Sequence, residues 1–273
     1  MTLWRWCAAV LLALNSLATS AASAAPDPGI AIAVAATRAA IGEHRLVLLG
    51  EYHGTREIPQ YTAALVDALS ADGSVALALE MSRSEQPALD AFMASDGSPE
   101  AVAKLQATPW WSIKGQQHDL RRSRDMFDMI LRLRELRAGG RAVSVWAIDL
   151  VSFAHLSADQ RDRDLASALR ERYSSDSSQR VLVLIGNVHA MLARPTRAPP
   201  QMQQPMGSYL TDLDPFSIRL SALKGEFWGC MGECKPITIQ PSGTVNSPWR
   251  GPDYSYFLVL PQLSVARFMD GAE

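Results

Sequence analysis

Two short motifs with the same spacing, Gly-x-x-His, carry residues that could do metal or acid–base chemistry. The first spans Gly50–His53 (GEYH) and the second spans Gly186–His189 (GNVH). Between them, Glu80 ends an apolar run. Two imidazoles and two carboxylates are a plausible ligand set for a divalent ion such as Mn, Co or Zn. The same groups could act without a metal, with a histidine as general base and a glutamate orienting it. The candidate residues for either role are Glu51, His53, Glu80 and His189.

Three further charged residues near these motifs could complete such a site. Arg56 follows the first motif, Arg83 follows Glu80, and Asp149 ends another apolar run. The arginines could bind an anionic or oxyanionic group. A plainer interpretation is that Glu80 pairs with one of the arginines because an unpaired buried carboxylate is costly. Asp149 could merely cap the loop that follows it. Their common position after apolar runs favours a functional site.

Four apolar runs predict the strands that position these residues. Each run is nearly continuous in Val, Leu, Ile and Ala, which is typical of strands buried on both faces of a parallel sheet. Each delivers an ionisable residue at its carboxyl end or a few residues beyond, and open α/β sheets bind ligands at that edge. The sequence therefore predicts one site at the carboxyl edge of a sheet. The runs are Leu46–Gly50, Val75–Glu80, Ala142–Asp149 and Val181–Asn187.

Helical patterns lie between these runs, and strands that alternate with helices predict an α/β fold with an open, mainly parallel sheet flanked by helices. The expected helices cover Tyr61–Ser70, Gln86–Ala94, Glu100–Leu105, Asp119–Arg137 and Ala158–Tyr173. A more irregular, β-rich part follows, with short strands expected at Phe216–Leu220, Pro236–Gln240 and Tyr256–Leu260. The segment Arg194–Pro205 is expected to be an exposed loop or lid.

The first 24 residues predict export. Arg5 precedes a short apolar run, Cys7–Leu14, and small residues then lead to Ala22-Ser23-Ala24. This is the layout of a secretory signal peptide, and the run is too short to span a bilayer. We expect cleavage near Ala24 and a periplasmic mature chain, residues 25–273, that forms a single domain without a stable membrane span. An uncleaved membrane anchor is the alternative.

Composition and the remaining cysteines add two expectations. With 273 residues, 48 % of them apolar, the chain can build a sizeable core, and a net charge of −2 gives no indication of a nucleic-acid partner. In an oxidising compartment, Cys230 and Cys234 are expected to form a local disulfide. A metal or redox pair is the alternative.

The same motifs resemble those of a known superfamily. Leu48–Glu57 (LLGEYHGTRE) resembles the opening motif of erythromycin esterase-like, ChaN-like and Tiki/TraB-like proteins, and Leu79–Met81 resembles their second motif. Arg161–Asp164 and Leu184–Ala190 resemble their last motif. The similarity runs over residues 45–210 and implies an α/β fold with a mainly parallel sheet.

The resemblance implies three different activities. ChaN-like proteins bind haem and are linked to iron uptake, whereas Tiki-like proteins are metal-dependent proteases whose paired motifs hold the metal. Erythromycin esterase-like proteins hydrolyse an ester with a histidine that activates water. The continuation Gly54–Glu57 is closer to the esterase-like motif than to the ChaN-like one. The residues at matching motif positions are His53, Glu80, Arg83 and His189.

Two functions follow as hypotheses. The first is an exported hydrolase that acts on an ester or peptide bond of a small molecule or peptide, with metal dependence left open. The second is a periplasmic haem-binding protein, with a tyrosine as an iron ligand among Tyr52, Tyr209, Tyr254 and Tyr256. Tryptophans could flank a porphyrin, although packing within loops is their simpler interpretation; they are Trp110, Trp111, Trp228 and Trp249. A third hypothesis is a protein that binds a partner and catalyses nothing.

Overall fold

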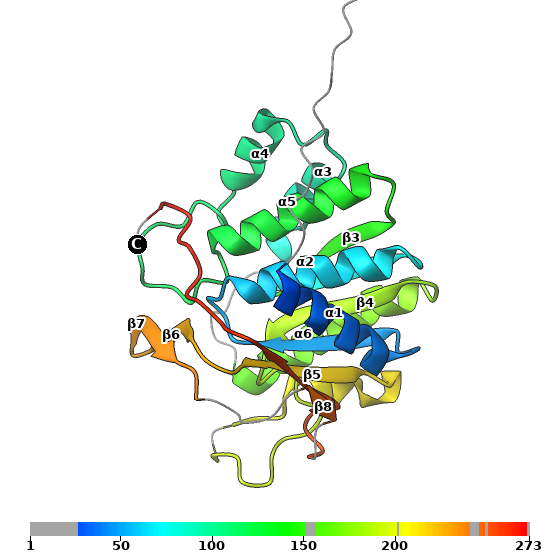
Figure 1. The fold of residues 1–273 in the computed structure, drawn as a ribbon, viewed down its shortest axis with the longest axis vertical. Helices are drawn as coiled ribbons and strands as arrows, with labels where there is room; N and C mark the ends of the chain where they lie inside the picture. Colours follow the sequence, from blue (N-terminus) through cyan, green and yellow to red (C-terminus); the bar gives the residue numbers. More distant parts are fainter. Residues whose placement is uncertain (1–26, 151–156, 201, 241–245, 249–250, 272–273) are drawn as a thin grey trace, which may run out of the picture.

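Seven strands form one sheet, in the order β3-β2-β4-β1-β5-β9-β8 (Figure 1). A computed structural model describes residues 27–150, 157–200, 202–240, 246–248 and 251–271, so the predicted signal peptide and Trp249 lie outside the described residues. All neighbouring strands are parallel except β8 and β9. The predicted α/β fold with an open, mainly parallel sheet is confirmed.

The four predicted apolar runs are the four strands at one side of this sheet. β1 is Leu46–Glu51, β2 is Val75–Ser82, β3 is Val143–Asp149 and β4 is Arg180–Gly186. β4 lies between β1 and β2, although it follows both in the chain. Because β4 runs parallel to both neighbours, the carboxyl ends of the three strands lie at the same edge of the sheet.

Helices cover both faces of the sheet, and each face has its own core. Val47 and Leu49 of β1 face the layer that contains α1, α2 and α5, whereas Leu46 and Leu48 face the layer of α6 and η2 (Figure 1). This alternation explains why the central strands are apolar at every position. The helices are α1 (Pro28–Ile41), α2 (Glu57–Ser70), η1 (Arg83–Glu85), α3 (Gln86–Met93), α4 (Pro99–Gln106), α5 (Arg124–Ala138), α6 (Ala158–Ser175) and η2 (Met206–Leu213).

Two helices differ from the sequence prediction in ways that matter for the site. The predicted helix Asp119–Arg137 begins only at Arg124, because the side chain of Ser123 caps it by accepting a hydrogen bond from the backbone N–H of Met126. Residues 119–123 are therefore a loop. Helix α1 was not predicted, although Asp27 caps its first turn and proline occupies its first position, both of which are start signals.

The C-terminal part is β-rich, as predicted, but most of it extends the main sheet. β5 (Phe216–Ala222), β9 (Tyr256–Leu260) and β8 (Ser247–Pro248) add to the edge beyond β1. β6 (Glu226–Met231) and β7 (Glu233–Thr238) form a separate antiparallel hairpin. The predicted disulfide is confirmed: Cys230 and Cys234 are joined across this hairpin, with an S–S distance of 2.00 Å.

Two further expectations concern the remaining segments. The segment expected to be a loop between Arg194 and Pro205 has no helix or strand in its described residues, and the Arg194 guanidinium donates to the backbone carbonyls of Met202 and Pro199. Within the described parts of the chain, no helix is long and apolar enough to cross a membrane.

Candidate functional site

The carboxyl ends of β1, β4 and β2 bring the predicted site residues together. Glu51 ends β1 and pairs in register with Gly186, which ends β4, and Glu80 lies on β2 at the other side of β4. Both glutamates are buried, with exposures of 5 % for Glu51 and 6 % for Glu80. Two carboxylates with so little access to water need cationic or hydrogen-bonding partners.

The imidazole of His53 lies between these two carboxylates. Its Nδ1 is 3.0 Å from Glu51 Oε1, and its Nε2 is 3.5 Å from Glu80 Oε2. A carboxylate accepts hydrogen bonds, so Glu51 fixes the tautomer of a neutral imidazole with its proton on Nδ1. Nε2 is then the basic nitrogen, and it lies on the Glu80 side of the ring.

The glycine of the second motif leaves room for this imidazole. A Cβ on Gly186 would lie 3.0 Å from His53 Nε2 and 3.4 Å from Glu80 Oε2. Neither Gly50 nor Gly186 has a positive φ, so the backbone conformation does not require glycine at either position. A Cβ on Gly50 would lie 3.1 Å from the Cα of Asn187, so both glycines permit close approach between neighbouring strands. Gly54, directly after the first motif, does have a positive φ, of +67°.

Two arginines neutralise the carboxylates at the centre of the site. Arg121 Nη1 donates to Glu80 Oε1 at 2.7 Å and lies 3.5 Å from Asp149 Oδ2. Arg161 Nη2 donates to the same Glu80 oxygen at 2.5 Å and to Asp149 Oδ2 at 2.7 Å, while its Nε donates to Asp149 Oδ1 at 3.2 Å. Asp149 is only 1 % exposed. Asp149 is therefore joined to Glu80 through Arg121 and Arg161, which contact both carboxylates.

His189 is held on both of its ring nitrogens. Arg161 Nη1 lies 2.9 Å from Nε2, and Asp162 Oδ1 lies 2.7 Å from Nδ1. Because a guanidinium can only donate, Nε2 accepts and Nδ1 carries the proton. Asp162 also accepts a hydrogen bond from the backbone N–H of Met206. His189 therefore orients Arg161, and the lone pair on His189 Nε2 is already occupied by that hydrogen bond.

The pKa values of the buried acids and of His53 follow from these contacts. Burial raises the pKa of Glu51, and the contact with His53 offsets only part of the rise. Burial alone would lower the pKa of His53, but Glu80 and Glu51 outweigh burial, and the pKa is raised. Burial opposes ionisation of Glu80 too, yet the surrounding cations, His53 foremost, hold its pKa well below the usual range. Glu80 is thus ionised at neutral pH and strengthens His53 as a base.

The predicted divalent-metal set does not fit this arrangement. Both Glu80 oxygens have partners, since Oε1 accepts from two arginines and Oε2 accepts from the backbone N–H of Gly186 at 2.8 Å. The Nε2 of His189 accepts from Arg161. Among the described residues, no group of three or more His, Cys, Asp or Glu side chains could hold a metal ion. Guanidinium groups take the central position that a cation would need, so the expectation of a metal is not supported.

Two predicted arginines lie apart from the cluster. Arg83 donates to Asp164 Oδ2 at 2.6 Å, and Arg56 donates through Nε to the backbone carbonyl of Val265 at 2.8 Å. Sequence reasoning missed Arg121 because a helix was expected there. The motif resemblance had marked Arg161, but it had not indicated its role.

A pocket of about 420 Å³ opens beside His53. One wall is polar, with Glu51, Asp119 and His189. The β6–β7 hairpin contributes the apolar residues Phe227, Trp228 and Ile237 to the lining. Tyr52 also lines the pocket, and its ring lies 4.8 Å from that of Phe227.

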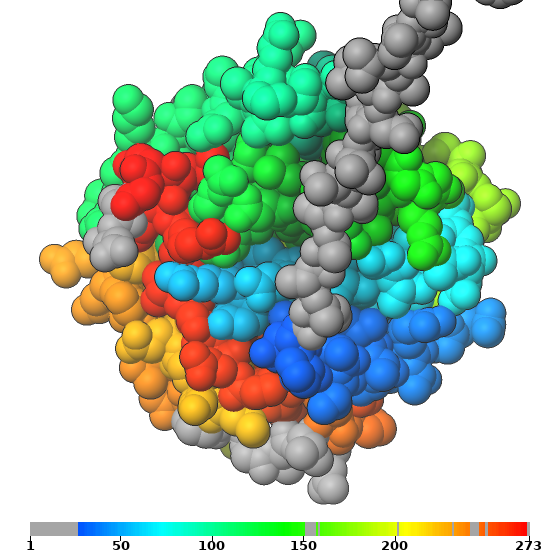
Figure 2. All heavy atoms as spheres, turned by 45° about the horizontal axis from the view of Figure 1, so that its top comes forward, coloured from blue at the N-terminus to red at the C-terminus, as the bar shows by residue number. Residues whose placement is uncertain are grey.

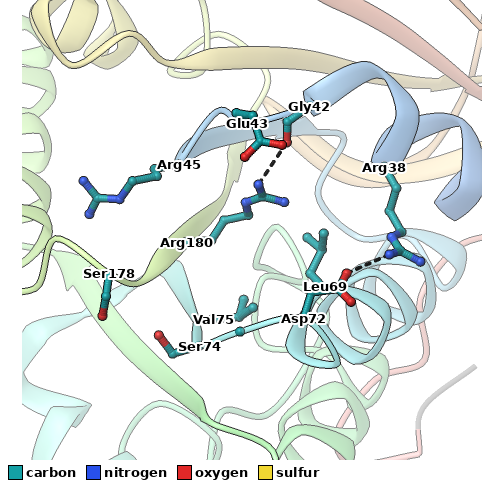
Figure 3. Close-up of a pocket in the computed structure, with 11 residues that line it drawn as sticks. Arg38, Gly42, Glu43, Arg45, Leu69, Asp72, Ser74, Val75, Ser178 and Arg180 are labelled. Atoms are coloured by element: carbon teal, nitrogen blue, oxygen red, sulfur yellow. Dashed lines mark hydrogen bonds and ion pairs between the residues drawn. The ribbon is translucent and has the colours of Figure 1, made fainter.

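A second pocket, of about 480 Å³, lies at the amino-terminal edge of the sheet (Figure 3). Its arginines are engaged with their surroundings, since Arg38 pairs with Asp72 at 2.7 Å and Arg180 donates to the Gly42 carbonyl at 2.9 Å. This pocket has no histidine in its lining. Glu51, His53 and His189 from the motifs line the pocket at the carboxyl edge and not this one.

Comparisons with known proteins agree with the resemblance inferred from the motifs. Residues 38–123 match the family model described as haem-binding uptake, Tiki superfamily, ChaN. This segment contains Glu51, His53, Glu80 and Arg121. No curated protein matches this chain in sequence.

Solved structures share the fold over most of the chain. One is a succinoglycan biosynthesis protein, with a TM-score of 0.64, 12 % identity, and coverage of 85 % of this chain and 91 % of the other. Another is an erythromycin esterase mutant, EreC, in its open conformation, with a TM-score of 0.62, 12 % identity, and coverage of 84 % and 93 %. A Bacillus cereus protein follows, with a TM-score of 0.57, 12 % identity, and coverage of 85 % and 91 %. At such identities, the similarity concerns the fold.

Proposed function

We propose that this chain is a hydrolase that cleaves an ester bond with His53 as the general base. The observation that carries the proposal is the imidazole itself, oriented by Glu51 at 3.0 Å, 3.5 Å from Glu80, and at the wall of a pocket large enough for a small molecule. A histidine oriented by a carboxylate is the arrangement that general-base catalysis requires. The resemblance of Leu48–Glu57 to the esterase-like motif and the fold shared with an erythromycin esterase support the same reaction class.

The proposed reaction uses water as the nucleophile. His53 Nε2 takes one proton from a water molecule while the water oxygen forms a bond with the ester carbonyl carbon. The carbonyl π electrons move to the carbonyl oxygen, and then return as the C–O bond to the leaving group breaks. The leaving alkoxide takes the proton from His53, which restores the neutral imidazole. Glu51 and Glu80 stabilise the imidazolium while it exists.

The charge of the site predicts which esters fit. Glu51, Glu80, Asp119, Asp149 and Asp162 supply five carboxyl groups, whereas Arg121 and Arg161 supply two guanidinium groups. Both guanidiniums are already bound to carboxylates. Carboxyl groups therefore outnumber guanidinium groups around the pocket, and we propose neutral or cationic esters as substrates in preference to anionic ones.

The test is hydrolysis of p-nitrophenyl esters that differ in charge, by the full chain and its variants. His53→Ala should reduce kcat/KM by about 100-fold or more, which is the usual contribution of a general base. His44→Ala is the matched control, since His44 bonds the backbone of Asp214 away from the pocket. Activity should persist in chelator. Full activity of His53→Ala, or equal loss in His44→Ala, contradicts the proposal.

A haem-binding function is the second candidate, because the matched family model describes haem-binding uptake. The structure narrows the iron ligands considered from sequence. The hydroxyls of Tyr209 and Tyr254 donate to Asp159 and to the Asn187 carbonyl, and Tyr256 does not line the pocket. Tyr52 and His53 both line it, and either could ligate iron. Trp110 and Trp111 are packed in the main core, so of the described tryptophans considered as porphyrin neighbours only Trp228 lines this pocket.

Haem titration distinguishes this candidate from the hydrolase. Under the haem hypothesis, micromolar protein should shift the Soret band, and Tyr52→Phe or His53→Ala should weaken the shift while Tyr256→Phe should not. No Soret shift in the wild type contradicts haem binding and leaves the hydrolase test unaffected.

Export is a separate part of the proposal. It is supported by the signal-peptide pattern of the first 24 residues and is consistent with the Cys230–Cys234 disulfide, because disulfides persist in oxidising compartments. Fractionation of the producing cells and sequencing of the mature N-terminus test it. A mature chain that starts at Ala25 in the periplasmic fraction is the expected result, and an uncleaved chain in the cytosol contradicts it.

A further inference from the structure

Three distant segments meet at the carbonyl of Gly54. This oxygen accepts hydrogen bonds from the backbone N–H of Trp228 at 3.1 Å and from that of Ala266 at 3.0 Å. Thr55 forms a β-bridge with Val265 beside it. The segment after the first motif, the β6–β7 hairpin and the C-terminal segment are thereby joined, and Figure 2 shows the red C-terminal segment against the orange hairpin.

A pocket of about 690 Å³ lies at this junction. Its apolar lining includes Trp228 and Phe268, which are 7 % and 6 % exposed and pack edge to face with ring centroids 5.1 Å apart. The indole N–H of Trp228 donates to the His118 carbonyl, which fixes the ring. Both aromatic rings belong to a small apolar cluster separate from the two main cores. The pocket thus has a rigid apolar surface suited to an aromatic or aliphatic group.

The polar lining of this pocket has surplus positive charge. Arg124 pairs with Asp128 at 2.8 Å, and Arg267 pairs with Asp125 and Asp128. Two carboxylates therefore balance two of the three arginines in the lining. The third, Arg56, is different: within the described residues, no carboxylate forms an ion pair with it.

Arg56 is nevertheless held in a defined place. Its Nε donates to the Val265 carbonyl at 2.8 Å, and its backbone N–H donates to the Ser264 carbonyl at 3.0 Å. The side chain is exposed and lines the pocket. An arginine anchored through Nε presents its terminal nitrogens to an acidic group, and a guanidinium fork matches carboxylate, sulfonate and phosphate.

We propose that this pocket binds an organic anion, with one acidic group on Arg56 and an apolar body on Trp228 and Phe268. The described lining of the pocket beside His53 has two carboxyl groups, Glu51 and Asp119, and no arginine or lysine, so the two pockets differ in the charge that they offer a ligand. Among the described residues, Trp228 is the one that the linings of the two pockets share. The binding site for the anion is therefore distinct from the proposed catalytic site, and it does not depend on the chemistry of His53.

Binding of 8-anilinonaphthalene-1-sulfonate to the full chain tests this proposal by fluorescence and calorimetry. The wild type should bind one probe molecule saturably, and octanoate should displace it whereas octanol should not. Arg56→Gln should weaken binding about tenfold or more, the usual effect of losing one charge-assisted hydrogen bond. Arg56→Lys should retain part of the affinity because it keeps the charge.

Two control variants separate this site from general effects. Arg163→Gln removes an arginine that is 63 % exposed and lies on α6, and it should leave binding unchanged. His53→Ala should also leave binding unchanged, even if it abolishes hydrolysis. The proposal is overturned if the wild type binds no probe saturably, if octanol competes as well as octanoate, or if Arg56→Gln binds like the wild type.

Discussion

Replacement of Arg161 by methionine is the perturbation most informative about the buried charge cluster. The Arg161 side chain is 17 % exposed and contacts Glu80, Asp149 and His189 together. Methionine keeps much of the apolar stem but removes the guanidinium. The substitution therefore leaves the carboxylates of Glu80 and Asp149 buried, at 6 % and 1 % exposed. In the described part of the cluster, Arg121 still contacts both of them, and His53 still lies beside Glu80.

The expected loss of stability can be bounded. Removing one partner of a buried ion pair costs about 3–5 kcal/mol, because the other charge stays buried. Since Arg121 still contacts Glu80 at 2.7 Å, we expect the lower end, about 3 kcal/mol. For a chain of this size, that loss lowers Tm by about 6–12 °C. Urea unfolding at pH 7.5, followed by circular dichroism, measures the change directly.

Arg163→Met is the matched control for this experiment. Arg163 is two residues further along α6, is 63 % exposed and forms an i,i+4 pair with Asp159 at 2.9 Å. An exposed pair of this kind contributes little to stability because solvent screens it. If Arg161→Met costs no more than Arg163→Met, the buried cluster is not held together as described here.

The pH dependence of the same variant gives a second check. The pKa of Glu80 is depressed in the native protein, so its stabilising contribution is complete above the unfolded-state pKa, about 4.3, and is lost as pH falls through the lower native pKa. Without Arg161, the native pKa of Glu80 rises toward the unfolded value. The stability difference between wild type and Arg161→Met should therefore stay constant from pH 7.5 down to about pH 5 and shrink as the pH falls below about 4.3. A difference that does not shrink below that pH contradicts the assignment.

Three other predictions follow from the site. NMR of the imidazole should give His53 a pKa above the usual value of about 6.5, and Glu80→Gln should lower that pKa. Because a general base works when deprotonated, the rising limb of the pH profile of kcat/KM should move to lower pH in the same variant. An unchanged His53 pKa in Glu80→Gln contradicts the electrostatic argument. Gly186→Ala places a Cβ 3.0 Å from His53 Nε2 and should reduce ester hydrolysis more than stability, whereas Gly73→Ala, with no atom within 4 Å of the added Cβ, should leave hydrolysis unchanged. Gly54→Ala would put a Cβ 2.7 Å from the Trp228 carbonyl oxygen at a residue whose φ is +67°. This variant should lower the free energy of unfolding by about 1–3 kcal/mol in urea. An unchanged stability would mean that the three segments do not pack tightly at Gly54.

Sequence reasoning predicted the site edge because burial on both faces leaves a clear signal. The four apolar runs of the central strands were readable, and in parallel strands the residues at their carboxyl ends must meet. Glu51, Glu80 and Asp149 were located in this way. The geometry of His53 between two carboxylates was not, since a spacing of residues does not specify side-chain directions.

The features that the sequence did not predict include the arginines of the charge cluster and one strand of the hairpin. Arg121 follows Leu120, which has a φ of +56°, and no periodic pattern indicates such a residue. The predicted metal is not supported because the motifs supply plausible ligand types, while the arginines that occupy their lone pairs come from an unpredicted loop and from α6. Hairpin strand β6 was also missed, because its Phe-Trp-Gly-Cys sequence has no clear alternation.

The strand order has a consequence for how the chain is made. Residues 38–123, which match the family model, contain β1 and β2 but not β4, which lies between them in the sheet. A fragment of these residues would leave both strands without the neighbour they share, as bare apolar edges that favour aggregation. During synthesis the two strands must wait for β4 to emerge, and a chaperone that holds them apart until then would raise the yield of native protein.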